Sequence, residues 1–153
     1  METLQPILAE HPFFADLDPT HLELLVGCAK NVRFEADAYL FREGEEANDF
    51  YLIRHGRVAI EVEAGGVPSV VATLEPGGIL GLTWLIPPYV RKVSARAVTL
   101  TRAISLDGAC MRRKCEADHG LGYELLKRLS HEMEERLHGA WLRVADIYGS
   151  GAR

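Results

Sequence analysis

The sequence lacks any apolar run long enough to cross a bilayer. Such a span needs about 18 or more consecutive apolar residues, and no stretch of the 153 residues reaches that length. The first residues, METLQPILAEHPFF, also lack the basic start and long apolar stretch of a secretory signal. We therefore expect a cytoplasmic protein with no membrane partner.

Basic residues are in deficit, because 17 Lys and Arg stand against 22 Asp and Glu, for a net charge of −5. Nucleic-acid affinity rests largely on clustered Lys and Arg that face phosphates. This balance argues against an exposed face for nucleic acid, and we expect no direct nucleic-acid partner.

Cysteine is scarce, and the three present, Cys28, Cys110 and Cys115, form no C-x-x-C motif. Three cysteines cannot all pair within one chain. We predict reduced, mostly buried thiols rather than a metal or redox site. The run CMRRKC places positive charge around two of them, which could lower a thiol pKa. A redox-sensing role is therefore an alternative to the preferred interpretation, the solvated basic face of a short helix.

The signatures of catalysis are missing. No G-x-S-x-G nucleophile motif occurs, and His55 is the only histidine in the strand-rich region, where a jelly-roll metalloenzyme would need two or three. We expect the remaining histidines to face solvent: His11, His21, His119, His131 and His138. The sequence predicts a protein that is not an enzyme, with no catalytic residue and no metal site.

What is present is the composition of an ordinary globular domain, with 48% apolar and 25% charged residues. We predict one domain in three parts: a helical cap over residues 1–30, a β jelly roll over 31–106, and C-terminal helices over 107–153. In the cap, Asp18 is a candidate N-cap, with Pro19 in the first helical position.

The middle segment consists of short strand-like runs separated by Gly-rich turns such as EAGGVP and EPGG. Val58, Ile60 and Val62 alternate with polar or small residues, which is typical of a strand with one buried face. Many short strands of this kind indicate a jelly roll, a barrel that closes its own edges.

Helical periodicity returns in the last segment, where Asp107 can cap a short helix and Gly120 precedes a long one that ends near Tyr148. An apolar stripe recurs at steps of three and four: Leu126, Leu129, Met133, Leu137, Ala140, Val144 and Ile147. At 1.5 Å per residue this helix would be roughly 40 Å long, more than a small barrel covers. We therefore favour a homodimer through residues 124–148 over packing against the chain's own barrel alone.

In this order the motifs resemble the cyclic-nucleotide-binding domain of the catabolite activator (Crp/Fnr) family of bacterial regulators. The stretches that carry the resemblance are HPFFADLDPTHLELLVGCAKNVRFEADAYLFREGEEANDFYLIRHGRVAIEVE, RAVTLTRAISLDGACM and LLKRLSHEMEERL, and Gly44 and Gly56 fall where that family turns its strands. The resemblance implies an eight-stranded, mainly β jelly roll with flanking helices, a phosphate-binding loop inside it and a long C-terminal dimer helix. It covers the chain without the family's helix-turn-helix domain.

The resemblance also implies a ligand site in GGILGLTWLIPPYVRKVSARAV. Backbone N–H groups of Gly81, Leu82 and Thr83 would face a cyclic phosphate, and Arg91 would supply the countercharge. Leu82 replaces the family's ribose-binding glutamate, so the ribose hydroxyl would lose a partner at a cost of about 1 to 3 kcal/mol.

Without gaps, Lys92 and Val93 fall on the small-residue pair that follows the family's arginine. A one-gap alternative places Val93, Ser94 and Ala95 on this motif and removes the arginine. On the long helix, Ala140 and Trp141 stand where the family's base-contacting polar residues lie. Trp141 could still stack on a planar ligand.

Residues 84–89, Trp-Leu-Ile-Pro-Pro-Tyr, form an apolar insert in this loop. We prefer the interpretation that they fill the pocket or barrel mouth, and the alternative is that they line a site for another ligand or a protein partner. The prolines predict that the short helix near Gly81 ends by Leu85. The sequence thus predicts a regulatory domain with weak or altered binding of cAMP or cGMP. Its alternative is a pseudo-sensor that binds no nucleotide and acts through protein partners.

Overall fold

The computed structural model of the chain describes residues 4–151. The helices are α1 (Gln5–Glu10), η1 (Pro12–Phe14), α2 (Pro19–Val26), η2 (Leu82–Trp84), α3 (Gly108–Ala117) and α4 (His119–Gly151). The strands are β1 (Ala29–Phe34), β2 (Tyr39–Phe41), β3 (Asp49–His55), β4 (Val58–Ala64), β5 (Val67–Leu74), β6 (Ile79–Leu80), β7 (Ser94–Ala97) and β8 (Thr101–Asp107). The mainly β architecture with flanking helices is confirmed.

The eight strands form two four-stranded antiparallel sheets, in the orders β1-β8-β3-β6 and β2-β7-β4-β5. Apart from the β4–β5 hairpin, consecutive strands lie in opposite sheets, and this mixed order is that of the predicted jelly roll. Tight turns with positive φ join several strands, including Gly44 at φ 91° and Gly56 at φ 90°. A side chain at Gly56 would collide with the backbone of Thr101 at 2.8 Å, so this turn requires glycine.

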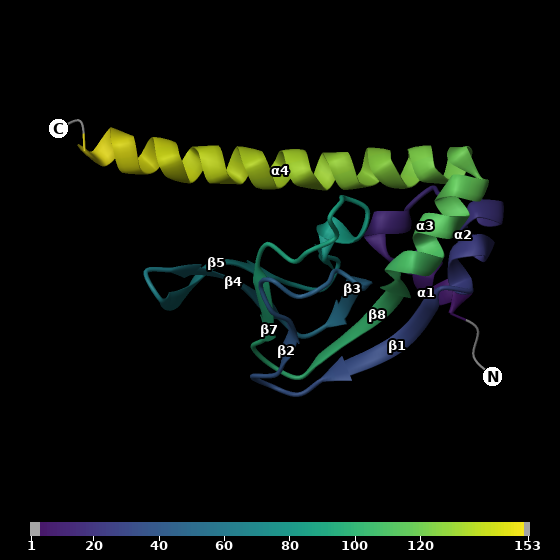
Figure 1. The fold of residues 1–153 in the computed structure, drawn as a ribbon, viewed down its shortest axis with the longest axis horizontal. Coiled ribbons are helices and arrows are strands. Elements are labelled where there is room, and N and C mark those ends of the chain that lie inside the picture. Colours follow the sequence, from purple (N-terminus) through teal and green to yellow (C-terminus); the bar gives the residue numbers. More distant parts are fainter. Residues whose placement is uncertain (1–3, 152–153) are drawn as a thin grey trace.

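Helices gather at one end of the barrel, and α4 runs along one side of the whole molecule (Figure 1). Its first half lies at the end where α1, α2 and α3 gather, directly beside α3, and its second half extends over the β4–β5 hairpin (Figure 1). Asp18 caps α2 by accepting from the Thr20 N–H at 2.8 Å, and Asp107 caps α3 by accepting from the Cys110 N–H at 2.8 Å, as predicted. Gly120 lies inside α4 rather than before it.

Two separate apolar cores stabilise this arrangement. The barrel core lies between the two sheets and contains Phe41, Tyr51 and Ile60. The helix-side core lies between the first sheet and the helices, and it joins Phe14 and Leu25 to strand residues and to α3 and α4. Because β3 and β6 contribute side chains to both the helix-side core and the barrel core, these two strands of the first sheet are buried on both faces.

The prediction that β4 has one buried face is wrong for its first half. Val58 and Ile60 face the barrel core as predicted, but Glu61 on the other face is also only 6% exposed. The Glu61 carboxylate accepts from the Tyr39 hydroxyl at 2.7 Å and from Arg96 Nε at 2.9 Å. Sequence alternation did not reveal this burial because it depends on side chains from β2 and β7 that cover Glu61.

Two further expectations are corrected by the structure. Cys28 and Cys110 form a disulfide, with their Cα atoms 5.7 Å apart, so only Cys115 is the free, buried thiol that was predicted. His11 does not face solvent but is 6% exposed. Its Nδ1 accepts from the Phe13 N–H at 3.2 Å, and its Nε2 lies 3.2 Å from the Ile53 carbonyl oxygen. The fold brings distant chain segments onto these residues, which local sequence patterns do not show.

Candidate ligand site in the barrel

The loop after β6 turns sharply at Gly81, whose φ of 83° lies in the left-handed region. A Cβ there would collide with Arg91 Nη1 and would lie 2.8 Å from the Asp49 carbonyl oxygen, so only glycine fits. The single turn η2 follows and ends at Trp84, as the two prolines predicted. The Pro87–Pro88 peptide bond is cis.

Arg91 is placed by backbone pairing with the loop between β2 and β3. Its N–H donates to the Glu45 carbonyl oxygen at 2.8 Å, and its own carbonyl oxygen accepts from the Gly44 N–H at 2.9 Å. Nearby, the Ala47 N–H donates to the Tyr89 carbonyl oxygen at 2.7 Å. This pairing directs the arginine side chain back toward Gly81.

The Arg91 side chain is buried, at 3% exposure. Its Nη2 donates to the Asp49 carbonyl oxygen at 2.6 Å, and the guanidinium lies over the Phe41 ring at 4.1 Å from the ring centre. The other two donors, Nε and Nη1, are buried without a hydrogen-bond partner. Among the described residues, no carboxylate lies within 4 Å of this guanidinium.

The electrostatics of the site reflect this burial. Loss of solvent lowers the pKa of Arg91 from its ordinary value, although the charges of Tyr51, Asp49 and Glu45 oppose the shift. Burial, with the nearby charge of Asp49, raises the pKa of Tyr51 to about 12. Leaving charged donors unpaired in an apolar interior is costly. An anion that accepted from Nε and Nη1 would satisfy them, but Nη1 lies directly against Gly81, so the guanidinium would have to move to admit an anion beside the loop.

The other predicted ligand residues lie at different depths. Leu82 and Thr83 are half-buried in η2, and Leu82 packs against the helix-side core. Lys92 is exposed, whereas Val93 packs against the barrel core. Trp141 is 63% exposed on the second half of α4, so the structure does not bring it into the buried cluster around Arg91.

The apolar insert at residues 84–89 does not occupy the space beside Arg91. Trp84 is 1% exposed and lies in the helix-side core, where its ring centre is 6.0 Å from that of Phe50. Tyr89 lies beneath Arg112, whose guanidinium is 4.3 Å from the ring centre. Ile86, by contrast, is 46% exposed. The prediction that the insert fills the pocket or barrel mouth is therefore wrong for Trp84, which packs in the helix-side core, and the guanidinium of Arg91 lies against Gly81 instead.

Sequence reasoning missed three residues around the site. Phe41 and Asp49 contact the Arg91 guanidinium, and Arg112, interpreted as part of a solvated face, donates to the Trp84 carbonyl oxygen. Phe41 and Asp49 belong to strands more than 40 residues before Arg91. Only the strand pairing of the barrel reveals their contacts.

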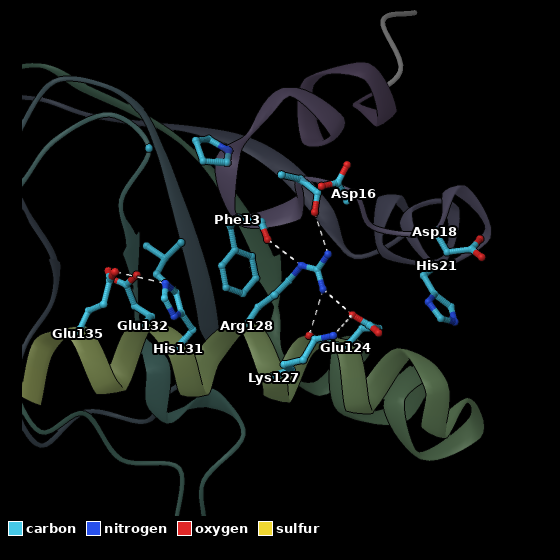
Figure 2. Close-up of a pocket in the computed structure, with 14 residues that line it drawn as sticks. Phe13, Asp16, Asp18, His21, Glu124, Lys127, Arg128, His131, Glu132 and Glu135 are labelled. Carbon is cyan, nitrogen blue, oxygen red and sulfur yellow. Dashed lines mark hydrogen bonds and ion pairs between the residues drawn. The ribbon is translucent and has the colours of Figure 1, made fainter.

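A second hollow lies outside the barrel, between the N-terminal helices, the turn before β6 and α4 (Figure 2). Its volume is about 1000 Å³. Arg128 spans one side of it, and its guanidinium donates to the Phe13 and Ala15 carbonyl oxygens and to Glu124 (Figure 2). These bonds tie η1 to α4. The hollow contains none of the predicted ligand residues.

Within residues 4–151, no group of three or more His, Cys, Asp or Glu side chains is arranged to hold a metal ion. No helix in that same span combines the length and apolar character needed to cross a membrane.

The chain is 32% identical over 144 residues to cyclic nucleotide-gated ion channel 18 of Arabidopsis thaliana, and the match covers 91% of this chain and 19% of the channel. It is 26% identical over 152 residues to the CRP-like cAMP-activated global transcriptional regulator of Mycobacterium tuberculosis, with 98% of this chain and 68% of the regulator covered. The similarity therefore concerns a part of each relative.

A solved structure and a family profile point to the same kind of domain as these relatives. A structure from Geobacter metallireducens GS-15, named for cyclic nucleotide binding, matches with a TM-score of 0.81 and 28% identity, and covers 90% of this chain and 100% of its own. The profile of the cyclic nucleotide-binding domain matches residues 31–118, which span the barrel and α3. The chain therefore belongs to the cyclic nucleotide-binding domain family.

Proposed function

We propose that this chain is a non-enzymatic regulatory domain in which Arg91 and the backbone N–H groups of Gly81, Leu82 and Thr83 hold the phosphate of a cyclic nucleotide, cAMP or cGMP. The observation that carries the proposal is the buried guanidinium of Arg91, with two unpartnered donors and no carboxylate within 4 Å among the described residues. A phosphate offers the charge and the acceptors that these donors lack.

The named activities of relatives support this choice of ligand. The Mycobacterium tuberculosis relative is named as cAMP-activated, and the Arabidopsis thaliana relative as cyclic nucleotide-gated. Both names describe proteins that respond to a nucleotide rather than transform it. A sensor role for this chain is consistent with them.

We propose that binding is weak or altered in specificity. Leu82 cannot accept a hydrogen bond from a ribose hydroxyl, and its side chain packs against the helix-side core. The unpaired hydroxyl would cost about 1 to 3 kcal/mol, or roughly a tenfold loss of affinity or more. Arg91 must also release the Asp49 carbonyl oxygen, or share its donors, before a phosphate fits beside Gly81.

Isothermal titration with cAMP and cGMP tests the proposal. We expect binding to the wild-type chain with a dissociation constant near or above about 1 μM. Arg91→Met keeps most of the side-chain volume and removes the charge, and we expect it to weaken binding at least about tenfold. The matched control is Arg33→Ala, which removes an exposed arginine that pairs with Glu35 on the surface. An Arg91→Met variant that binds as tightly as the wild type contradicts the site.

Folding of Arg91→Met serves as an internal check. Because the variant removes a buried, partly unsatisfied charge, we expect its melting temperature to equal or exceed that of the wild type. Loss of binding in a protein that melts at or above the wild-type temperature then reports on the ligand site and not on misfolding.

A second candidate function is a pseudo-sensor that binds no nucleotide and contacts a protein partner through the insert at residues 84–89. The exposure of Ile86, at 46%, with Pro87 and Pro88 also exposed, favours it. No heat with either nucleotide, together with a co-purifying partner that is lost on Ile86→Glu, would support this function over the first.

We also propose a homodimer through α4, in the cytoplasm and without nucleic-acid contacts. On α4, Leu121, Leu125 and Leu129 are at most 1% exposed and pack against the helix-side core. Leu129 of the predicted stripe is therefore covered by the chain itself. With Ser130 in its place, the other members of the stripe form a second row roughly a quarter turn away from these three leucines, at alternating steps of four and three: Leu126, Ser130, Met133, Leu137, Ala140, Val144 and Ile147. Alternating steps of this kind are those of a coiled-coil seam. The exposed members of this row would be buried by the same helix of a second chain.

A further inference from the structure

The disulfide between Cys28 and Cys110 joins the end of the helical cap to α3. Cys28 lies between α2 and β1 and is 7% exposed, whereas Cys110 lies in the first turn of α3 and is half-buried. The two cysteines are 82 residues apart in the chain. The bond therefore connects two elements that reach each other only in the folded protein.

The same turn of α3 contacts the loop of the candidate site, residues 81–91, which we call the ligand loop. A Cβ at Gly108 would lie 3.4 Å from the Cβ of Trp84, so α3 begins directly against η2. Arg112 donates to the Trp84 carbonyl oxygen and covers the Tyr89 ring, so it contacts both ends of the insert. The Trp84 N–H in turn donates to the Gly81 carbonyl oxygen at 3.3 Å.

Cys110 lies two residues after Gly108 and two residues before Arg112. We propose that the Cys28–Cys110 disulfide is a redox-sensitive link that holds the first turn of α3 against the ligand loop, so that its reduction loosens the loop and weakens ligand binding. The predicted weakening of ligand binding rests on the proposed function, whereas the predicted loosening of the loop does not. In a reducing compartment, disulfides that form are usually transient and responsive rather than structural.

The reaction is a two-electron exchange with a dithiol reductant. One thiolate of the dithiol attacks Sγ of Cys110, which belongs to the more exposed of the two residues, and the S–S bond to Cys28 breaks. Cys28 leaves as a thiolate and takes up a proton. The second thiol of the reductant then attacks the mixed disulfide and releases Cys110, so the dithiol is oxidised to a disulfide and both cysteines are reduced.

Cys115, the third cysteine, does not compete for this role. It is 9% exposed in the helix-side core, and burial, with the charges of Glu116 and Asp118, raises the pKa of its thiol. A neutral, buried thiol exchanges slowly. Cys115 therefore provides a matched control within the same helix.

Other contacts keep the base of α3 attached when the disulfide opens. The Asp107 N–H donates to the Cys28 carbonyl oxygen at 2.9 Å, and Lys114 Nζ donates to the Leu24 carbonyl oxygen. Reduction is therefore expected to loosen the turn that carries Gly108 and Arg112 without unfolding the domain.

The first experiment follows Trp84 and needs no ligand. In a Trp141→Phe variant, Trp84 is the only tryptophan. Acrylamide quenching and the emission wavelength are compared in the oxidised form and after a dithiol reductant, with thiols counted by alkylation and mass spectrometry. Wavelength and quenching are preferred to intensity because a disulfide itself quenches indole emission. We expect one reactive thiol before reduction of the unfolded chain and three after, with stronger quenching and a red shift of folded Trp84 after reduction.

The second experiment titrates cAMP into oxidised and reduced protein with the native Trp141. We expect the wild type to bind cAMP at least about fivefold more weakly after reduction. Cys28→Ala should bind like the reduced wild type under both conditions, and Cys115→Ala should respond to reduction like the wild type. If neither form binds cAMP or cGMP, the proposed function fails. The quenching of Trp84 then still tests whether the disulfide holds the ligand loop. The link is overturned if quenching is the same in both forms, or if all three thiols react before any reductant is added.

Discussion

At the scale of single residues, buried polar groups separate into those with partners and those without. Glu61 accepts from Tyr39 and Arg96, and these bonds lower the pKa of its carboxyl despite the opposing effect of burial. Arg91 retains two donors without partners. Glu61, with its partners, stabilises the barrel. Arg91, with two unpaired donors, is the group that a bound anion would stabilise most.

His11 provides a pH-dependent prediction. Its Nδ1 accepts from Phe13, so Nε2 carries the proton given to the Ile53 carbonyl oxygen, and the ring is neutral. Burial lowers its pKa below the ordinary value of 6.5, while the bond to Ile53 partly opposes this shift. The unfolded chain therefore binds the proton first as pH falls. The stability that the neutral ring contributes is complete above pH 6.5 and declines below it.

We expect the free energy of unfolding to fall by at most about 1.4 kcal/mol per pH unit just below pH 6.5. His11→Asn retains an acceptor for the Phe13 N–H and cannot titrate, so its unfolding free energy should change less over this range. Urea unfolding between pH 7.5 and 5.5 measures both proteins. The assignment is wrong if wild type and variant show the same slope.

The residue scale was the hardest to predict from sequence. Arg91 lies beside Gly81 in the structure, and nothing in the local pattern indicated that it would be buried without a carboxylate. His11 was predicted to face solvent and is buried instead. In both cases one hydrogen-bond partner lies more than 40 positions away in the chain, so the burial was decided by tertiary packing.

At the scale of elements, α4 is a helix of 33 residues, about 50 Å long at 1.5 Å per residue. Its early residues are packed against the helix-side core, whereas residues 140–149 are all exposed. Arg143 still reaches the Val71 carbonyl oxygen of β5, so the second half lies near the β4–β5 hairpin. Periodicity predicted the helix and its apolar row, but the structure decided which part of that row the chain itself covers.

The proposed dimer gives a matched pair of variants on α4. Leu137 is 58% exposed and lies in the seam, whereas Leu142 is 54% exposed and lies roughly on the opposite side of the helix. We expect Leu137→Glu to shift the sedimentation coefficient to that of a monomer, because it would bury a carboxylate in the seam. Leu142→Glu should leave the dimer intact. Equal behaviour of the two variants, or a monomeric wild type, contradicts the proposed seam.

At the scale of the whole molecule, the disulfide closes a long loop that contains the entire barrel. It joins residues 82 positions apart and links the cap to the C-terminal helices. A cross-link of this span restricts the unfolded chain, so its loss costs about 2 to 5 kcal/mol of stability. The effect adds to the two apolar cores, which stabilise the barrel and the helices separately.

We therefore expect a dithiol reductant to lower the free energy of unfolding by about 2 to 5 kcal/mol. For a domain of about 150 residues this corresponds to roughly 2 to 4 °C in melting temperature per kcal/mol. Urea unfolding and calorimetry of oxidised and reduced protein measure it. Cys28→Ala should be insensitive to the reductant and Cys115→Ala should respond like the wild type. No change on reduction in the wild type would mean that the bond does not constrain the unfolded chain.

The sequence by itself determined the jelly roll, the helices that flank it, the caps at Asp18 and Asp107, and the turn at Gly81. These features depend on periodicity, capping side chains and glycine, all of which act between neighbouring residues. Only the tertiary structure decided which side chains are buried without partners, that Trp84 lies in the helix-side core, and that Cys28 meets Cys110. Those contacts arise when strands and helices far apart in the chain pack together, and local patterns carry no record of them.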